Sequence, residues 1–346
     1  MHAPSSDILF ERRGVAGIVT LNRPKALNAV THEMVRALGI QLAAWAQDGA
    51  VTRVIVIAAG ERAFSAGGDI RALYDLGRAG KQEEALGFFR EEYTLNAAIK
   101  RYRKPYVALI DGIVMGGGFG VSVHGSHRVA GDRFQFAMPE VGIGFFPDVG
   151  GTFVLPRMPD EIGTWCALTG DRLKTADAVA TGIATHHVRS DRFAELTDAL
   201  CGNVPVDATL AAFATPAGEG PVTARRDAIR ALFSAARVEA ILSALDGAGD
   251  DWARATAATI QSKSPTSLKL ALAQLRRGVD WSFEQCMRAE MRIVSRIVYD
   301  HDFYEGVRAV IVDKDNAPRW DPATLAAVTD AEVERHFAAL AEELAL

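Results

Sequence analysis

Hydrophobic residues near the start of the chain are spaced first as in strands and then as in a helix. Two short segments, Ile8–Phe10 and Val15–Leu21, flank an Arg-Gly turn and predict a β-hairpin. Thr31 then precedes a stretch with helical periodicity, in which Met34, Leu38, Leu42 and Trp45 share one face. The pattern therefore predicts a hairpin followed by an amphipathic helix.

Continuous apolar runs further along predict strands that are buried on both faces. Val54–Ala58 is one such run, and Tyr106–Ile110, directly after Pro105, is a second. Glu83–Tyr102 between them has helical spacing, and Val129–Ala130 and Phe134–Ala137 are short strand candidates. The repeated order of strand, strand and helix predicts an α/β fold class.

The second half of the chain has a different pattern. Prolines and glycines punctuate Pro205–Pro221, which predicts a linker or an irregular connection. Beyond it the periodicity is helical, over residues 224–236, 238–245, 251–263, 265–277 and 283–300. We therefore expect a core over residues 1–204 and a mostly helical C-terminal region over residues 205–346.

Composition and charge exclude several classes of protein. The 346 residues are 49% hydrophobic and 23% charged, as in ordinary globular proteins. A net charge of −5 argues against a nucleic-acid partner, which would need a basic face. The longest apolar stretch, Tyr106–Val123, is interrupted by Asp111 and five glycines, so we expect no membrane span.

Cysteines and the N-terminus bear on the compartment. Cys166, Cys201 and Cys286 are far apart, odd in number and without metal-ligand spacing, which favours small buried side chains in a reducing environment. The first fourteen residues carry acidic groups and no apolar core of the kind that a secretory signal has. These features predict a cytoplasmic protein.

Two glycine-rich segments follow the buried strands. The first is Phe64-Ser65-Ala66-Gly67-Gly68-Asp69-Ile70, and the second is Met115-Gly116-Gly117-Gly118-Phe119-Gly120, which Val121–His124 can continue as a helix. Glycines there let backbone N–H groups approach a ligand oxygen, and free amides at a helix start suit an oxyanion or a phosphate. The alternatives are a plain turn for the first segment, which is the simpler explanation of that segment taken alone, and close helix–strand packing for the second.

A third segment, Met138–Gly151, holds two carboxylates in an apolar, glycine- and proline-rich setting. Glu140 and Asp148 would be costly to bury without partners or a task. If they share a pocket, their pKa values are pushed apart, so that one is ionised while the other donates a proton. The alternative is that both face water or that one caps a helix.

Taken together, in this order and at these separations, the three segments resemble the crotonase superfamily of enoyl-CoA hydratases and isomerases. The resemblance implies a ββα spiral core that binds an acyl-CoA. It also implies an oxyanion hole formed by the amides of Gly68 and Gly117; losing one such donor costs about 10²–10³ in rate.

The subfamily resemblance depends on the carboxylates. A typical hydratase has a glutamate after the glycine run, where this chain has Gly120, and another that matches Glu140. Gly120 together with Met138-Pro139-Glu140 and Phe146-Pro147-Asp148-Val149-Gly150-Gly151 resembles the 3-hydroxyisobutyryl-CoA hydrolases. So do segments in the C-terminal half, among them Lys263–Lys269 and Asp302–Ala309, and the resemblance covers about residues 8–338.

That resemblance implies roles for individual residues. Glu140 attacks the thioester carbonyl or activates water as a general base, and Asp148 orients the hydroxyl group or the water and helps to protonate the leaving thiolate. Glu92 would line the acyl pocket, and Phe145 and Phe146 are candidates for its wall. Arg23 and Lys25 would lie near the CoA nucleotide or simply face solvent.

No cofactor or metal is expected, because CoA is part of the substrate; His124 and His127 are interpreted as structural. A monomer and a small homo-oligomer both stay open, as does the exact acyl group, since one methyl is worth only about 1–3 kcal/mol in a pocket. The rival functions are enoyl-CoA hydration or isomerisation and non-catalytic acyl-CoA binding.

Overall fold

The computed structural model describes residues 6–346 and groups them into two compact units that interleave along the chain. The first unit comprises the chain up to Asp69, Thr94–Phe136 and Arg172–Ala224. The second comprises Ile70–Tyr93, Ala137–Asp171 and Arg225–Leu346. The division expected near residue 205 stays a prediction. The N-terminal residues 1–5, on which part of the expectation about a secretory signal rests, lie outside the described residues.

The first unit is built on a six-stranded sheet with the order β1-β2-β3-β5-β7-β10. Its strands are β1 (Ile8–Arg13), β2 (Ala16–Leu21), β3 (Arg53–Ala58), β5 (Tyr106–Ile110), β7 (His127–Ala130) and β10 (His186–His187). The hairpin β1–β2 is antiparallel, and every later pairing is parallel. The predicted hairpin and the predicted buried strands are therefore confirmed, as is the α/β class.

Helices cover both faces of this sheet. Ala16, Ile18 and Val107 belong to an apolar cluster on one face, which α8 (Phe193–Leu200) and α9 (Val206–Phe213) complete with leucines and Phe213. Gly17 points to the opposite face, where a Cβ would meet the ring of Trp45 at 2.7 Å. Trp45 lies on α1 (His32–Gln47), whose predicted N-cap Thr31 accepts a hydrogen bond from the Met34 amide at 3.2 Å.

Shorter elements complete the first unit. A four-stranded sheet has the order β4-β6-β8-β9, from β4 (Ala63–Ser65), β6 (Ile113–Met115), β8 (Gln135–Ala137) and β9 (Leu173–Lys174). The short helical segments include η1 (Pro24–Ala26), α4 (Gly116–Gly120), α7 (Thr175–Ala180) and η5 (Ser190–Arg192). The glycine run is thus itself the helix α4, and residues 121–124, expected to continue as a helix, form turns.

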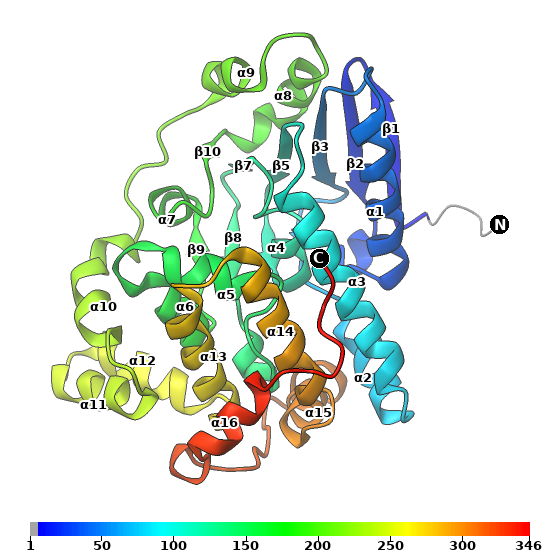
Figure 1. Cartoon of the computed structure of the whole chain (residues 1–346). Helices are drawn as coiled ribbons and strands as arrows, with labels where there is room; N and C mark the ends of the chain where they lie inside the picture. The colour runs from blue at the N-terminus through cyan, green and yellow to red at the C-terminus, as the bar shows by residue number, and fades with distance from the viewer. Residues whose placement is uncertain (1–5) are drawn as a thin grey trace. The chain divides into compact units, whose positions relative to one another are not determined.

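The second unit is helical. Its elements are α2 (Ile70–Arg78), the first part of α3 (Gln82–Lys100), η2 (Glu140–Ile143), α5 (Gly151–Val154), α6 (Ile162–Thr169), α10 (Arg226–Phe233), α11 (Val238–Ala248), α12 (Asp251–Gln261), α13 (Pro265–Gly278), α14 (Phe283–Ile297), α15 (His301–Val307) and α16 (Asp330–Phe337) (Figure 1). The five helices expected beyond residue 223 all form, with ends shifted by a few residues.

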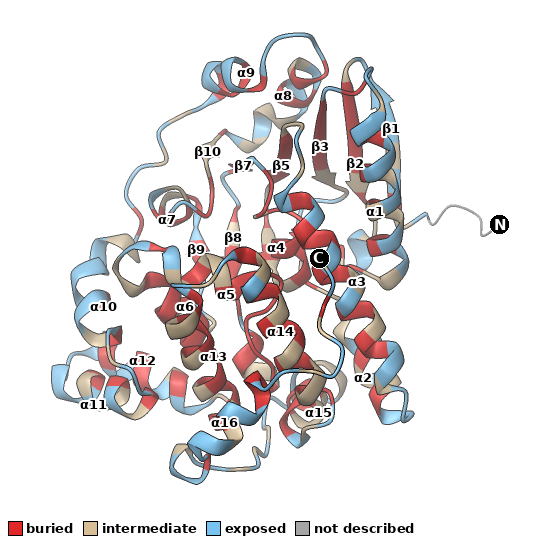
Figure 2. Ribbon diagram, viewed as in Figure 1, coloured by how far each residue is buried: buried red, intermediate tan, exposed pale blue. Residues whose placement is uncertain are grey.

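Two long helices, α13 and α14, form much of the second unit's interior (Figure 2). Ser264 caps α13, and Ser282 opens α14 with a complete capping box that includes Gln285. The apolar stripe of each helix is buried, and Gly278 of α13 lies so close to Thr152 that a Cβ would come within 2.1 Å of its carbonyl oxygen. These contacts fix α5 and the loop that precedes it.

The helix α9 changes the interpretation of the expected linker. The linker expected over Pro205–Pro221 is partly wrong, because α9 occupies its first half; Val206, Leu210 and Phe213 bury one face of that helix. Over residues 6–346, no helix has both the length and the apolarity that a bilayer crossing requires.

Candidate active site

The two predicted oxyanion donors lie on neighbouring segments of the first unit. Gly68 forms a parallel bridge with Val30, in which Val30 bonds to the Gly67 carbonyl at 2.8 Å and to the Asp69 amide at 2.9 Å. The Gly68 amide therefore faces away from Val30. A Cβ on Gly67 would lie 3.8 Å from the Gly117 nitrogen, so the two glycine segments are adjacent.

Close packing explains one of the glycines of α4. A Cβ on Gly118 would come within 2.6 Å of the Ser65 carbonyl oxygen, which only glycine avoids. Gly117 is the second residue of α4, so its N–H is among the amides that a helix start leaves without an intrahelical partner. Close packing, one of the two interpretations left open from sequence, thus applies to Gly118, and ligand binding by the Gly117 amide stays a prediction.

The three predicted acidic residues belong to the second unit. Glu92 lies on α3, Glu140 begins η2, and Asp148 lies in the loop before α5. Their relative exposures are 2%, 6% and 5% respectively, so the alternative of water-facing carboxylates is excluded. Among the described residues, no hydrogen-bond partner reaches Glu92 Oε1 or Glu140 Oε2.

Burial and mutual repulsion keep protons on these carboxyl groups. Burial first, and then the neighbouring Asp148, raise the pKa of Glu92 and of Glu140 well above the ordinary value. Burial raises the pKa of Asp148 to about 7, against a hydrogen bond from Tyr93 that lowers it. At neutral pH the cluster can therefore hold an ionised and a neutral carboxyl group together, which is the combination that acid–base catalysis uses.

Two further polar residues join this cluster and were not assigned a role from sequence. The Tyr93 hydroxyl donates a hydrogen bond to Asp148 Oδ2 at 2.9 Å. Glu290 of α14 accepts hydrogen bonds from the backbone amides of Gly150, at 2.9 Å, and Thr152, at 3.0 Å. Its side chain is 0% exposed. One feature of the sequence could have identified Glu290: it is an acidic residue on the apolar face of an amphipathic helix.

Aromatic side chains pack around the cluster. Phe145 stacks on Phe89 with ring centroids 5.6 Å apart, and it also contacts Phe146 at 4.8 Å and Phe303 at 5.6 Å. Phe145 and Phe146 are 3% and 0% exposed, so both belong to the interior of the second unit. Phe89 also contacts the ring of Tyr93, with centroids 6.0 Å apart, so this aromatic group adjoins the cluster.

Other candidates from the sequence have different surroundings. Arg23 is paired with Asp69 at 3.0 Å and Asp7 at 3.3 Å, so its charge is already compensated, whereas Lys25 is exposed. His127 bonds to Ser126 and to Asp207, each at 2.8 Å, in agreement with a structural role. All three cysteines are free and buried, as predicted.

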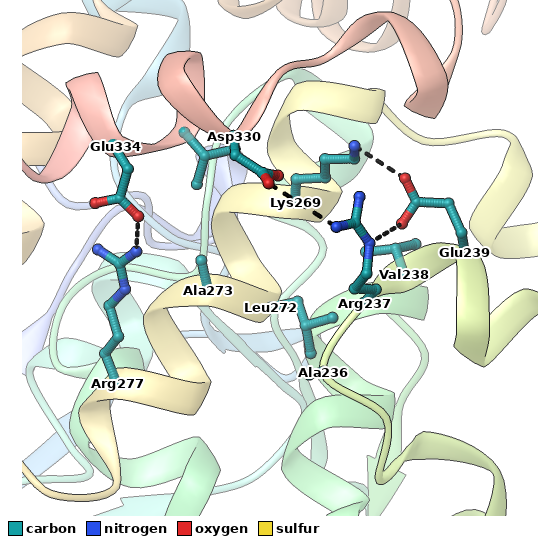
Figure 3. A pocket seen from close by; sticks show the side chains of 11 residues that line it. Ala236, Arg237, Val238, Glu239, Lys269, Leu272, Ala273, Arg277, Asp330 and Glu334 are labelled. Atoms are coloured by element: carbon teal, nitrogen blue, oxygen red, sulfur yellow. Dashed lines mark hydrogen bonds and ion pairs between the residues drawn. The ribbon is translucent and has the colours of Figure 1, made fainter.

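A separate pocket of about 200 Å³ in the second unit contains none of the predicted site residues (Figure 3). Its charged side chains pair with one another: Lys269 with Glu239 at 2.9 Å, and Arg277 with Glu334. Arg237 lies between Glu239, at 3.8 Å, and Asp330, at 3.9 Å. The pocket thus offers balanced charge rather than an uncompensated cation for a phosphate.

Comparison with known proteins agrees with the motifs. Residues 16–337 match the family model described as enoyl-CoA hydratase/isomerase. A relative from Danio rerio, named 3-hydroxyisobutyryl-CoA hydrolase, mitochondrial, is 46% identical over 97% of this chain and 91% of its own length. The Homo sapiens protein of the same name is 44% identical over 97% of this chain and 89% of its own.

Solved structures show the same fold. A structure titled carnitinyl-CoA dehydratase, from Mycobacterium thermoresistibile, matches with a TM-score of 0.95 and 44% identity, covering 99% of each chain. One titled enoyl-CoA hydratase, from Rhodobacter sphaeroides, matches with a TM-score of 0.93 and 37% identity, covering 99% of this chain and 100% of its own.

The predicted cytoplasmic location is contradicted by these comparisons, since the curated relatives are named as mitochondrial. The prediction was wrong because the N-terminal composition and the free cysteines do not distinguish the cytoplasm from the mitochondrial matrix. The missing apolar segment argues only against a secretory signal, and mitochondrial targeting segments are amphipathic and lack one as well. Free, buried cysteines are typical of a reducing compartment, and the cytoplasm and the mitochondrial matrix share that property.

The family resemblance inferred from the three motifs is confirmed by the family model, by the curated relatives and by the solved structures. The mixed α/β architecture with its helical second half is the one those structures share. This chain belongs to the enoyl-CoA hydratase/isomerase family, the crotonase superfamily, and is similar over nearly its whole length to the 3-hydroxyisobutyryl-CoA hydrolases.

Proposed function

We propose that this chain hydrolyses the thioester of 3-hydroxyisobutyryl-CoA, or of a close 3-hydroxyacyl-CoA, to the free acid and CoA, as a step of valine catabolism. One observation carries the proposal: the similarity to proteins named for this reaction extends over 97% of the chain at 44–46% identity. The site residues then suggest how each step proceeds.

Gly120 supports hydrolysis over hydration. Hydratases of this family use two glutamates, and the position of the first is occupied here by Gly120, which is buried at the end of α4. A glycine can neither activate water nor donate a proton. The second glutamate position is kept as Glu140, so one carboxylate is present for attack or base catalysis.

In the proposed reaction the thioester oxygen accepts hydrogen bonds from the amides of Gly68 and Gly117 as it becomes an oxyanion. Glu140 either attacks the carbonyl carbon, giving a mixed anhydride that water then cleaves, or takes a proton from the attacking water. In both routes the carbon–sulfur bond breaks, and the thiolate of CoA receives a proton.

Asp148 is the proposed source of that proton. Its pKa of about 7 lets it carry a proton at neutral pH and release it when the thiolate forms. Glu92 would line the acyl pocket, where its buried, unpartnered Oε1 suits a substrate hydroxyl group. No separate cofactor is proposed, since CoA arrives as part of the substrate.

Hydration or dehydration of an enoyl-CoA is the second candidate function. It is favoured by the titles of the two solved structures described above, one a dehydratase and one a hydratase. Both functions require an oxyanion hole and an acyl-CoA, so only the reaction products separate them. Hydrolysis releases a free thiol, and hydration removes the enoyl absorbance without releasing one.

The test is thiol release, followed with a thiol-reactive dye, from (S)-3-hydroxyisobutyryl-CoA and from crotonyl-CoA. Rapid release from the hydroxyacyl thioester alone supports the hydrolase. Loss of the crotonyl-CoA enoyl absorbance without thiol release supports the hydratase instead. Binding of both thioesters with neither change would indicate a non-catalytic acyl-CoA-binding protein.

A further inference from the structure

The backbone turn that follows Asp148 is bent in an unusual way. Val149 has φ +48° and Gly150 has φ +90°, so two consecutive residues adopt the left-handed region. Glycine adopts it freely, but a β-branched valine does so only when its surroundings hold it there. Something outside the turn must therefore hold the backbone next to the proposed proton donor.

Glu290 is the group that holds this turn from the α14 side. Its Oε2 accepts the Gly150 amide at 2.9 Å, and its Oε1 accepts the Thr152 amide at 3.0 Å. Both carboxylate oxygens are thus used, one on each side of Gly151. The side chain is 0% exposed, so water does not compete for these two hydrogen bonds.

The turn is held at its other end as well. Gln274 of α13 donates a hydrogen bond to the Pro147 carbonyl at 2.6 Å, one residue before Asp148. Within the turn, the Gly151 amide donates to the Asp148 carbonyl at 2.8 Å. The backbone of Asp148 is thereby fixed from both sides, while Tyr93 orients its carboxyl group.

We propose that Glu290 is a positioning residue for the thioester hydrolysis, which acts through Asp148 by holding the strained turn at Val149–Thr152. This inference rests on the proposed function, because it takes Asp148 as the proton donor of that reaction. Glu290 itself acts on the backbone of the turn and has no proposed contact with the substrate. A proton donor must be placed within hydrogen-bond reach of its acceptor, so a small displacement of the turn impairs catalysis.

Burial and the backbone amides have opposing effects on the proton of Glu290. Burial, and then the neighbouring Asp148, raise the pKa of Glu290 to about 8, while the two backbone amides oppose the shift. The two amide donors favour the ionised form of Glu290, which can accept a hydrogen bond from both N–H groups at once.

The test compares Glu290→Gln with Glu284→Gln, a matched change six residues earlier on the same helix, at a half-buried side chain. The glutamine keeps one acceptor but turns an N–H₂ group toward an N–H donor, so one hydrogen bond is lost. We expect kcat for thiol release from (S)-3-hydroxyisobutyryl-CoA to fall about 10- to 100-fold. The KM should change less than about threefold, and Glu284→Gln should behave like the unchanged protein.

A double-mutant cycle with Asp148→Asn separates positioning from general damage to the fold. If Glu290 acts through Asp148, then Glu290→Gln should reduce the residual rate little further in the Asp148→Asn background. Equal loss in both backgrounds, or unchanged kcat in the single variant, would overturn the proposal. Glu290→Asp, which keeps a carboxyl group but is shorter, should recover part of the rate.

Amide hydrogen exchange of residues 148–154 keeps the inference testable if the protein hydrolyses no acyl-CoA. Exchange in this segment should be faster in Glu290→Gln than in the unchanged protein, whereas exchange in α13 and α14 should not change. An unchanged protein that releases no thiol, combined with faster exchange, rejects the proposed function but keeps Glu290 as the anchor of the turn. Unchanged exchange rejects the anchor, whatever the reaction.

Discussion

Asp148 is subject to opposing influences on its proton. Burial disfavours the ionised form and raises the pKa to about 7, whereas the Tyr93 hydroxyl donates to the carboxylate and favours ionisation. Glu140 lacks such a donor at Oε2, and its pKa lies well above the ordinary value. The Tyr93 hydroxyl thus favours an ionised Asp148, whereas the proposed reaction needs Glu140 ionised and Asp148 protonated. That reaction therefore requires the proton to pass from Glu140 to Asp148 when the substrate binds.

Glu140→Gln tests the central assignment. Glutamine keeps the shape of the side chain but can neither attack the carbonyl nor accept a proton from water, so thiol release should fall by at least about 10³-fold. CoA binding, measured by calorimetry, and the melting temperature should stay close to those of the unchanged protein. Near-normal turnover in this variant would refute the role of Glu140.

Tyr93→Phe tests the control of the Asp148 proton. Losing the donor removes the contribution that lowers the pKa of Asp148, so that pKa rises above about 7. With Asp148 as the proton donor, the alkaline limb of the kcat–pH profile should move to higher pH, and kcat at pH 7 should fall about tenfold as the carboxyl group loses its orientation. A profile identical to that of the unchanged protein would show that Tyr93 has no such influence.

At the scale of elements, regular periodicity made the strands and long helices predictable. The face of α1 with Met34, Leu38, Leu42 and Trp45 is buried as its spacing indicates. By contrast, α9 was hidden by the flanking prolines and glycines, since its burial depends on the apolar cluster of the sheet rather than on its own pattern. Glu290 was missed because its partners are backbone amides more than a hundred residues away, which no local pattern encodes.

The glycine helix α4 can be tested by one added methyl group. Gly118→Ala would bring a Cβ within 2.6 Å of the Ser65 carbonyl oxygen, so α4 must shift away from β4 and carry the Gly117 amide with it. We expect thiol release to fall about 10²-fold or more, as for the loss of an oxyanion donor.

Gly39→Ala is the matched control within another helix. Nothing lies within 4 Å of a Cβ at Gly39 of α1, so alanine should raise the free energy of unfolding by roughly 0.5–1 kcal/mol and leave activity unchanged. Denaturant titration and the thiol assay measure both variants. Full activity in Gly118→Ala would show that α4 is not held by this contact.

At the scale of the whole molecule, the buried carboxyl groups make stability depend on pH. In the folded protein the pKa of Asp148 is raised from 3.8 to about 7 and that of Glu290 from 4.5 to about 8. A raised pKa means that stability is fully present below the unfolded value and is lost as pH rises through the folded value. The loss should therefore develop between about pH 4 and pH 8.

Asp148→Asn measures that loss directly, because asparagine stays neutral throughout. Its stability relative to the unchanged protein should increase from pH 4 to pH 8, by on the order of a few kcal/mol. Asp246→Asn, at an exposed position of α11, is the control and should show no comparable trend. Thermal unfolding at several pH values gives the comparison, and parallel curves for the two variants would contradict it.

The three free cysteines determine the background signal of the thiol-release assay. Cys166 and Cys286 are 0% exposed and Cys201 is 9% exposed, and burial raises the pKa of Cys286 to about 12 and that of Cys201 above its ordinary value. Since only the thiolate reacts with a thiol dye, the folded enzyme should contribute almost no background colour to an assay of released CoA. Unfolding exposes all three, so the same reagent, applied without substrate, becomes a stoichiometric reporter of the unfolded fraction.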